Sequence, residues 1–370
     1  MDELTKAYLS KKFKEYYSKA NLTPPPDFEK REWAFVPFET LPDFFMQRHL
    51  SFESLEHLKA YILSSPPAHV FYSSACYLKP KEPMEKKGWL YADLIFDIDA
   101  DHLPLKDKSM ETALKVAKKE IIRLSEILQR DFGISEKDMK IVFSGGRGYH
   151  IHVYDRDFQL LGSPERREIV DYLSINSPTN GKSLQMARVR KCVLAFFRNK
   201  EKEGKLTEFL KRSGIRSERT KKDLKDLISN KQLGRKFIRG EYDLRKISKG
   251  KRFQNMISRI LDVCTSKHSI HIDAPVTADV KRLIRFPGSI HGKSGLKTME
   301  IDLNSIEEFD PFADAIAFGD EKVKLTISPE KDVKIQMRGE KFRFKAGERV
   351  TAPEFVAIHL LCRGVARYGH

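Results

Sequence analysis

The chain contains an apolar stretch, residues 89–99, that turns abruptly acidic and limits how the chain can fold. It ends in Phe96-Asp97-Ile98-Asp99, in which apolar and acidic side chains alternate. In a β-strand, side chains two positions apart point to the same face. Asp97 and Asp99 would therefore share one face, while Phe96 and Ile98 would be buried on the other. The stretch predicts a central strand that ends at a polar site.

The two carboxylates have two interpretations. Lying roughly 7 Å apart on one face of a strand, they repel each other unless a cation lies between them. Hard oxygen ligands suit Mg²⁺ or Mn²⁺, which keep coordination positions open for water and for substrate phosphates. The alternative is a polar strand end that exposes Asp97 and Asp99 to water. The pair is a candidate metal site on this basis.

A glycine-rich turn follows, with the sequence SGGRGYH at residues 144–150, between two predicted strands. Its three glycines allow backbone N–H groups to approach an anion closely. Arg147 offers a forked guanidinium for bidentate contact with a phosphate, and His150 adds a donor. A tight hairpin with an exposed arginine would have the same sequence. The turn is thus a candidate phosphate-binding site, with a plain hairpin as the alternative.

A third motif lies downstream. Residues 269–273 alternate like a strand and end at Asp273, as the earlier strand ends at Asp97. Arg285 and His291 then flank a Pro-Gly turn. Each histidine of this segment could instead be a packed or surface imidazole.

The three motifs together fit one chemistry. Phosphoryl transfer to a 3′-hydroxyl uses two cations held by carboxylates about 3.5–4 Å apart. It also needs fixed positive groups around the triphosphate. The carboxylates would come from Asp97, Asp99 and Asp273, and the positive groups from Arg147, His150, Arg285 and His291.

The organisation of the chain changes at about residue 163. Strand and helix signals mix before that point, and they resume after residue 262. Residues 163–262 have a sequence pattern typical of helices and are rich in Lys and Arg. We therefore expect a mixed α/β domain formed by residues 1–162 and 263–370, interrupted by a basic helical subdomain. A closing helix is predicted from Pro353 to about Arg367.

Charge and cysteine content narrow the class of protein. The formal net charge is +16, which suits a polyanionic partner, either nucleic acid or an anionic membrane surface; a generally basic, soluble surface is the alternative. The four cysteines lie far apart without a CxxC pair, so we expect no disulfides and a reducing cytoplasm. No apolar run approaches the roughly 20 residues that span a bilayer. These features argue against a secreted or membrane-inserted protein.

The order and spacing of the motifs resemble the catalytic small subunit of archaeal/eukaryotic-type DNA primases, in its archaeal branch. FDID and SGGRGYH are followed by IDAPVTADVKRLIRFPGSIHGKSG at residues 272–295, and the likeness includes the closing segment, residues 353–364. The resemblance implies a mixed α/β primase domain with an inserted helical subdomain. It also implies metal ligands at Asp97, Asp99 and Asp273, nucleotide-phosphate contacts at Ser144, Arg147, His150, Arg285 and His291, and a further substrate contact at Arg48.

The resemblance also implies an activity and partners. Such a subunit makes short RNA primers, and in some cases DNA primers, on single-stranded DNA from NTPs or dNTPs, using Mg²⁺ or Mn²⁺. It works with a primase large subunit and the replication machinery at the fork, in the cytoplasm and away from membranes. Members of the family usually carry a zinc module after the aspartate strand. Residues 102–122 contain no cysteine here, so we expect no zinc.

Two other functions remain open. A primase-like repair polymerase would use the same chemistry to extend existing ends. A non-catalytic nucleic-acid-binding scaffold would keep the basic surface, and loss of Asp97 would then change nothing but charge.

Overall fold

The computed structural model describes residues 1–103, 109–175 and 184–369. The fold is a mixture of helices and antiparallel sheets, which confirms the predicted mixed α/β class. The chain divides into two compact units, one formed by residues 1–167 and 272–370 and the other by residues 168–271.

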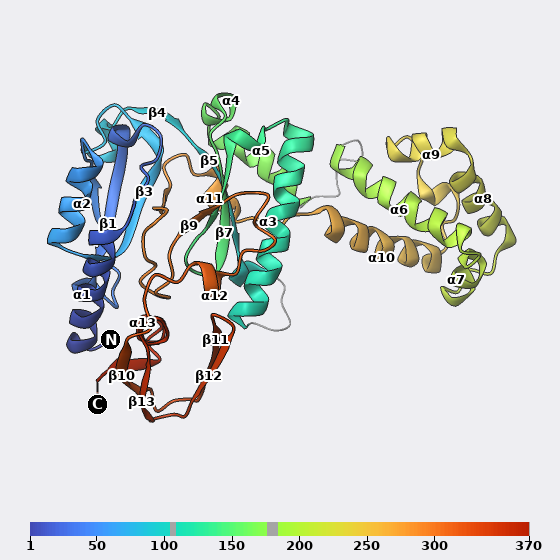
Figure 1. Cartoon of the computed structure of the whole chain (residues 1–370). Helices are drawn as coiled ribbons and strands as arrows, with labels where there is room; N and C mark the ends of the chain where they lie inside the picture. Colours follow the sequence, from blue (N-terminus) through green and yellow to red (C-terminus); the bar gives the residue numbers. More distant parts are fainter. Residues whose placement is uncertain (104–108, 176–183, 370) are drawn as a thin grey trace. The chain divides into compact units, whose positions relative to one another are not determined.

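The first sheet of the larger unit lies next to the N-terminal helices. Its strand order is β2-β1-β3-β4, and β8 also pairs with β3. All eleven residues of β3 are buried, so this strand forms the centre of the sheet. Figure 1 shows α1 and α2 beside these strands. The elements are β1 (Arg31–Pro37), β2 (Gln47–Leu50), β3 (Pro67–Tyr77), β4 (Trp89–Ala92), β8 (Leu283–Arg285), α1 (Glu3–Lys19) and α2 (Leu55–Ser64).

The second sheet carries the predicted motifs. Its strand order is β5-β7-β6-β9, and every pair in it is antiparallel. Helix α3 packs on this sheet through a stripe of buried residues at helical spacing, which includes Leu114, Ile121 and Leu128. Its N-cap is Ser109, whose side chain accepts a hydrogen bond from the backbone N–H of Thr112. The elements are β5 (Leu94–Asp99), β6 (Met139–Phe143), β7 (Gly148–Val153), β9 (Met299–Ile301) and α3 (Met110–Phe132).

The predicted single strand over residues 89–99 is wrong, because β4 and β5 belong to different sheets. The chain changes sheet at Asp93, which is fully buried. Its carboxylate lies 2.8 Å from the Arg31 guanidinium and accepts a 2.8 Å hydrogen bond from the Gln159 amide. Arg166 donates to the Asp93 carbonyl at 3.0 Å. A buried carboxylate needs such partners, and the break in the strand brings them within reach.

The predicted strand over residues 269–273 is also wrong. Helix α10 (Lys251–His268) is followed by an irregular segment, and Asp273 is the N-cap residue of the short helix α11 (Ala274–Ala278). Pro275 stands in the first turn of α11, where its fixed φ and missing N–H favour a helix start over a strand.

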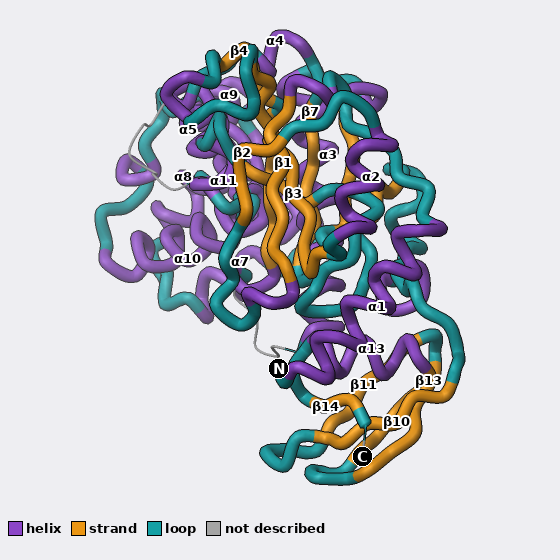
Figure 2. Tube along the Cα trace, turned by 90° about the vertical axis from the view of Figure 1, so that its left-hand side faces the viewer, coloured by secondary structure: helices purple, strands orange, loops and turns teal. Residues whose placement is uncertain are grey.

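The C-terminal part of the larger unit is a small sheet of order β13-β10-β14 and a hairpin, β11-β12. Figure 2 shows α13 next to these strands, near the C-terminus. The predicted closing helix is too long: α13 ends at Cys362, Gly364 adopts a φ of 67°, and the chain continues as β14. The elements are β10 (Lys322–Ile327), β11 (Val333–Met337), β12 (Glu340–Phe344), β13 (Arg349–Pro353), β14 (Ala366–Tyr368), α12 (Pro311–Asp314) and α13 (Glu354–Cys362).

The smaller unit is helical and has a hydrophobic core of its own, with Val193, Phe197, Leu224 and Phe253 among its buried residues. The sequence predicted a helical subdomain at residues 163–262, and the compact unit runs from residue 168 to residue 271. No helix in the described ranges is long and apolar enough to cross a membrane. The remaining helices are α4 (Arg156–Gln159), α5 (Ser163–Ser174), α6 (Leu184–Lys202), α7 (Leu206–Arg212), α8 (Glu218–Ser229) and α9 (Lys231–Ile238).

Candidate active site

The acidic end of β5 lies against β7. Asp97 and Asp99 are half-buried, whereas Phe96 and Ile98 are fully buried, as the alternation predicts. Asp97 is directly opposite His150 in the ladder, and its Oδ1 lies 3.5 Å from His150 Nε2. The pairing therefore brings one of the predicted aspartates next to the last residue of the glycine-rich motif.

Asp273 joins this end of the sheet through its backbone. Its N–H donates to the Asp97 carbonyl at 2.9 Å. Within the described residues, however, no three His, Cys, Asp or Glu side chains are grouped as a ready-made metal-ligand set. The structure thus places Asp97, Asp99 and Asp273 in neighbouring segments without converging all three side chains on one point.

The glycine-rich turn connects β6 to β7 and is held by Ser144. Its Oγ accepts hydrogen bonds from the backbone N–H groups of Gly146 (3.2 Å) and Gly148 (3.3 Å). Gly148 has no room for a Cβ atom, because one would overlap the Ile98 carbonyl of the paired strand. The side chain of Ser144 thus stabilises the conformation of the turn through hydrogen bonds to its backbone.

A second loop, residues 286–298, lies against this turn. Thr298 Oγ1 donates to the Ser144 carbonyl at 3.2 Å, and Ser294 Oγ donates to the Gly145 carbonyl. The second loop is itself braced by α13, since His359 Nδ1 donates to the Ser294 carbonyl at 2.7 Å. The two candidate phosphate-binding loops are therefore joined to each other and to the C-terminal helix.

A cavity of about 610 Å³ opens between these segments. Asp99, Asp101 and Glu111 lie among its lining residues. Five cationic side chains also line it, and they come from segments that are distant in sequence: Arg147, Arg285, Lys293, Lys334 and Arg363. Arg147 forms a 3.1 Å ion pair with Asp101 within this lining. A cavity with carboxylates and an excess of cations suits a polyphosphate whose reacting end lies near the carboxylates.

Arg285 and His291 keep distinct charge states in this cavity. Burial lowers the pKa of Arg285 to about 9, so its guanidinium stays charged at neutral pH. Burial, with the nearby charge of Arg285, holds the pKa of His291 well below its usual value. Because His291 Nδ1 accepts the backbone N–H of Lys293 at 3.2 Å, the neutral ring carries its proton on Nε2. His291 can therefore donate one hydrogen bond to an anion.

His150 is also neutral at physiological pH. Burial and, to a smaller degree, Arg285 lower its pKa to about 4. The imidazole therefore adds no positive charge beside the Asp97 carboxylate. Because His150 does not neutralise the Asp97 carboxylate, the negative charge of this carboxylate favours a cation at this end of β5.

The cavity does not include every predicted residue. Asp99, Arg147, Arg285 and His291 line it, while Asp97, Ser144, His150 and Asp273 lie in adjoining positions. Arg48 stands elsewhere, on β2, where its Nε donates to the fully buried Glu32 carboxylate at 3.1 Å. The expectation that the protein binds no zinc stays a prediction. It rests on residues 102–122, and residues 104–108 of this segment lie outside the described residues.

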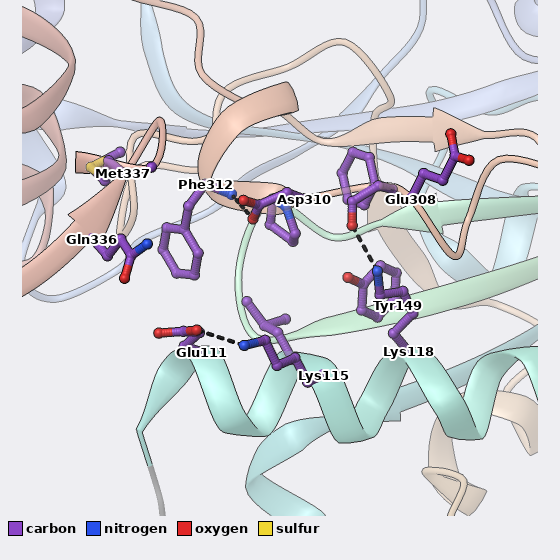
Figure 3. Close-up of a pocket in the computed structure, with 13 residues that line it drawn as sticks. Glu111, Lys115, Lys118, Tyr149, Glu308, Asp310, Phe312, Gln336 and Met337 are labelled. Carbon is purple, nitrogen blue, oxygen red and sulfur yellow. Dashed lines mark hydrogen bonds and ion pairs between the residues drawn. The ribbon is translucent and has the colours of Figure 1, made fainter. Parts of the chain in front are cut away.

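A second cavity of about 330 Å³ shares lining residues Glu111, Phe312 and Gln336 with the first. Figure 3 shows Tyr149 and Phe312 among its walls. Lys118 closes one side by donating at 2.8 Å to the Phe309 carbonyl. The two cavities together extend along the same face of α3.

The sequence motifs do not include Lys334 and Arg363 among the candidate phosphate contacts. Lys334 belongs to β11 and Arg363 follows α13, so the fold alone brings them to the cavity. The sequence could have identified Asp101 as a residue of the site, because it continues the acidic alternation two residues beyond Asp99.

A mixed α/β domain with this combination of strand-end carboxylates and converging cations has the features expected of a nucleotidyltransferase. Comparison with known proteins agrees. The sequence model of the DNA primase small subunit family matches residues 96–303. The DNA primase small subunit PriS of Archaeoglobus fulgidus is 48% identical over 99% of both chains.

Other archaeal relatives match over a similar extent. The PriS proteins of Methanococcoides burtonii and Methanosarcina acetivorans are 37% and 36% identical, over all of this chain and 100% and 98% of theirs. The chain belongs to the DNA primase small subunit family.

Proposed function

We propose that this chain is the catalytic subunit of a DNA primase, which joins nucleoside triphosphates into short RNA primers, and DNA primers from dNTPs, on single-stranded DNA. The observation that carries the proposal is the cavity of about 610 Å³, which Asp99 and Asp101 line together with five cationic side chains. A triphosphate bound there would be neutralised by Arg147 and Arg285 at one end of the carboxylate-bearing strand. Membership of the family supports the same activity.

We propose further that two Mg²⁺ or Mn²⁺ ions are held by Asp97, Asp99 and Asp273. The donor chemistry fits, because all three offer hard carboxylate oxygens and come from segments in contact at the end of β5. Divalent ions at these residues would supply charge neutralisation and activate a 3′-hydroxyl. The chain's own groups do the rest: Arg285 orients the phosphates, and His291 donates from Nε2.

The partners that we propose are a primase large subunit, a single-stranded DNA template and the replication machinery. Arg48 remains a proposed substrate contact, although its present partner is Glu32. Primer synthesis on unprimed single-stranded DNA, with NTPs or dNTPs and with or without the large subunit, tests the proposal. An enzyme that extends only existing ends would make no product on this template, and a non-catalytic scaffold would make none on any template.

Arg147→Ala should raise the apparent KM for nucleotides and lower turnover, while template affinity stays close to that of the native protein. The variant loses one bidentate phosphate contact, which we expect to cost about 2 kcal/mol, or roughly 30-fold in kcat/KM. Steady-state kinetics and template binding measure the two effects separately. Arg130→Ala, on the exposed end of α3, is the control. Loss of DNA binding with unchanged nucleotide kinetics would make Arg147 a template contact instead.

Template binding should weaken steeply with salt, since basic side chains displace condensed counterions from the strand. Exposed Arg235, Lys236 and Arg239 in the helical unit are candidates for this contact. Their joint replacement by Gln should reduce the slope of log K against log salt by up to about 2. The matched control replaces three exposed lysines of α1: Lys11, Lys14 and Lys19. Equal slopes in the two variants would assign the Arg235 cluster to solvent.

A further inference from the structure

A buried histidine that none of the sequence motifs includes lies next to the nucleotide cavity. His69 is the third residue of β3 and is 0% exposed. Its Nδ1 lies 2.7 Å from Arg285 Nη1 and 3.2 Å from the backbone nitrogen of Gly292. Its ring meets the His291 ring edge-on, with the centroids 5.1 Å apart. One imidazole thus contacts three parts of the candidate phosphate site.

The two short contacts fix the proton on the His69 ring. An arginine guanidinium and a backbone N–H are both donors and have no acceptor to offer. Nδ1 must therefore be unprotonated and accept both hydrogen bonds, which leaves the proton on Nε2. Burial, and then the charges of Arg285 and Lys293, hold the pKa of His69 well below its usual value, consistent with a neutral ring.

This acceptor controls how Arg285 is presented. The guanidinium also lies over the face of the Phe71 ring, 4.8 Å from the centroid. Neither an aromatic ring nor a neutral imidazole neutralises the charge, so His69 orients the guanidinium and leaves the charge available to an anion. A carboxylate at position 69 would orient the same group but cancel much of that charge.

The same acceptor also fixes the loop that bears His291. Gly292 has no room for a side chain, because a Cβ there would overlap the backbone of Ala68, the residue before His69. The loop is therefore packed directly on β3. His69 holds it from this side, while His359 holds it from α13.

We propose that His69 is a positioning residue for nucleotide binding: its Nδ1 sets both the Arg285 guanidinium and the 291–293 loop in the geometry that receives a triphosphate. The inference rests on the proposed function, in which Arg285 and His291 contact phosphates. If the role of His69 were purely structural, its replacement would affect folding and would not weaken nucleotide binding more than template binding.

Two variants of similar shape separate the acceptor from the packing. In His69→Asn the side-chain Oδ1 takes the place of Nδ1 and can accept both hydrogen bonds. His69→Leu has almost the same outline but no acceptor. We expect His69→Leu to raise the apparent KM for nucleotides, and the Kd for a nucleoside triphosphate, by about 10-fold or more. Turnover should change less, and His69→Asn should stay within about 3-fold of the native KM.

The measurements are steady-state kinetics, equilibrium nucleotide binding, single-stranded DNA binding and thermal unfolding on the full chain. If His69→Leu does not fold, His69→Gln replaces it, because its amide reaches the Nε2 position and leaves the Nδ1 position empty. Equal nucleotide KM values for the Asn variant and for either of the other two would overturn the inference. So would a parallel loss of template binding. Primer synthesis by the native chain on unprimed single-stranded DNA is assayed alongside. If the native chain makes no primers, the proposed function has failed; if it makes them, the His69 variants test the positioning role separately.

Discussion

Asp97→Asn makes primers at least about 100-fold more slowly than the native chain, and Asp99→Asn does the same, if the proposed metal site is correct. Each substitution removes one negative charge from a pair on the same face of β5 and keeps the size of the side chain. Neutral His150 beside Asp97 cannot take over the role of an anionic ligand. The measurement is primer synthesis on unprimed single-stranded DNA, in Mg²⁺ and in Mn²⁺.

The matched control is Asp302→Asn. Asp302 is exposed and directly follows β9 of the same sheet, so it is also an aspartate at a strand end. We expect native activity from this variant, and unchanged thermal unfolding and template binding from all three. Near-native synthesis by Asp97→Asn in both metals would contradict the assignment of the metal ligands.

Asp93→Ala should lower the free energy of unfolding by about 3–5 kcal/mol, because it leaves the Arg31 guanidinium buried without its counter-ion. Both side chains are 0% exposed, and their charged atoms lie 2.8 Å apart. Burial acts to lower the pKa of Arg31, but the charge of Asp93 and its hydrogen bond, together with Cys76 and Tyr72, raise the pKa above its usual value overall. Urea-induced unfolding measures the effect.

An exposed ion pair of the same unit provides the comparison. Arg338 and Asp320 lie 3.0 Å apart, with side chains 38% and 74% exposed. Asp320→Ala should cost less than about 1 kcal/mol, because water already screens this pair. Similar losses for Asp93→Ala and Asp320→Ala would mean that the buried pair contributes no more than a surface pair does.

The parts of the fold that were predictable follow from local periodicity. The alternation around Asp97 predicted β5, because burial of one face is encoded in a few consecutive residues. The helical spacing of the buried residues Leu114, Ile121 and Leu128 in α3 is a local pattern of the same kind. The change of sheet at Asp93 was not predictable in this way. Arg31, the buried partner of Asp93 at this change, lies more than 60 positions earlier in the sequence.

Some parts of the candidate site were also predictable from the local sequence, and others were not. The glycine turn of residues 144–148 could be recognised because its conformation depends on its own glycines and on Ser144. The strand predicted to end at Asp273 failed because Pro275 starts a helix there, a local signal that outweighs alternation. Nothing in the local sequence shows that Lys334 and Arg363 line the cavity or that His69 lies next to it. Only the packing of β3, β11 and α13 brings them there.

The brace between α13 and the Ser294 loop has a consequence for the synthesis of the protein on the ribosome. The strands that bear Asp97 and the glycine turn are complete by residue 153, long before residues 354–363 have been translated. Until these residues emerge, the 286–298 loop lacks the hydrogen bond from His359, and the cavity lacks Arg363. A nascent chain can thus pair β5, β6 and β7 early, but the cavity is complete only after α13 has been translated. Chains that terminate before α13 would therefore lack both the His359 brace of this loop and the Arg363 side chain of the cavity.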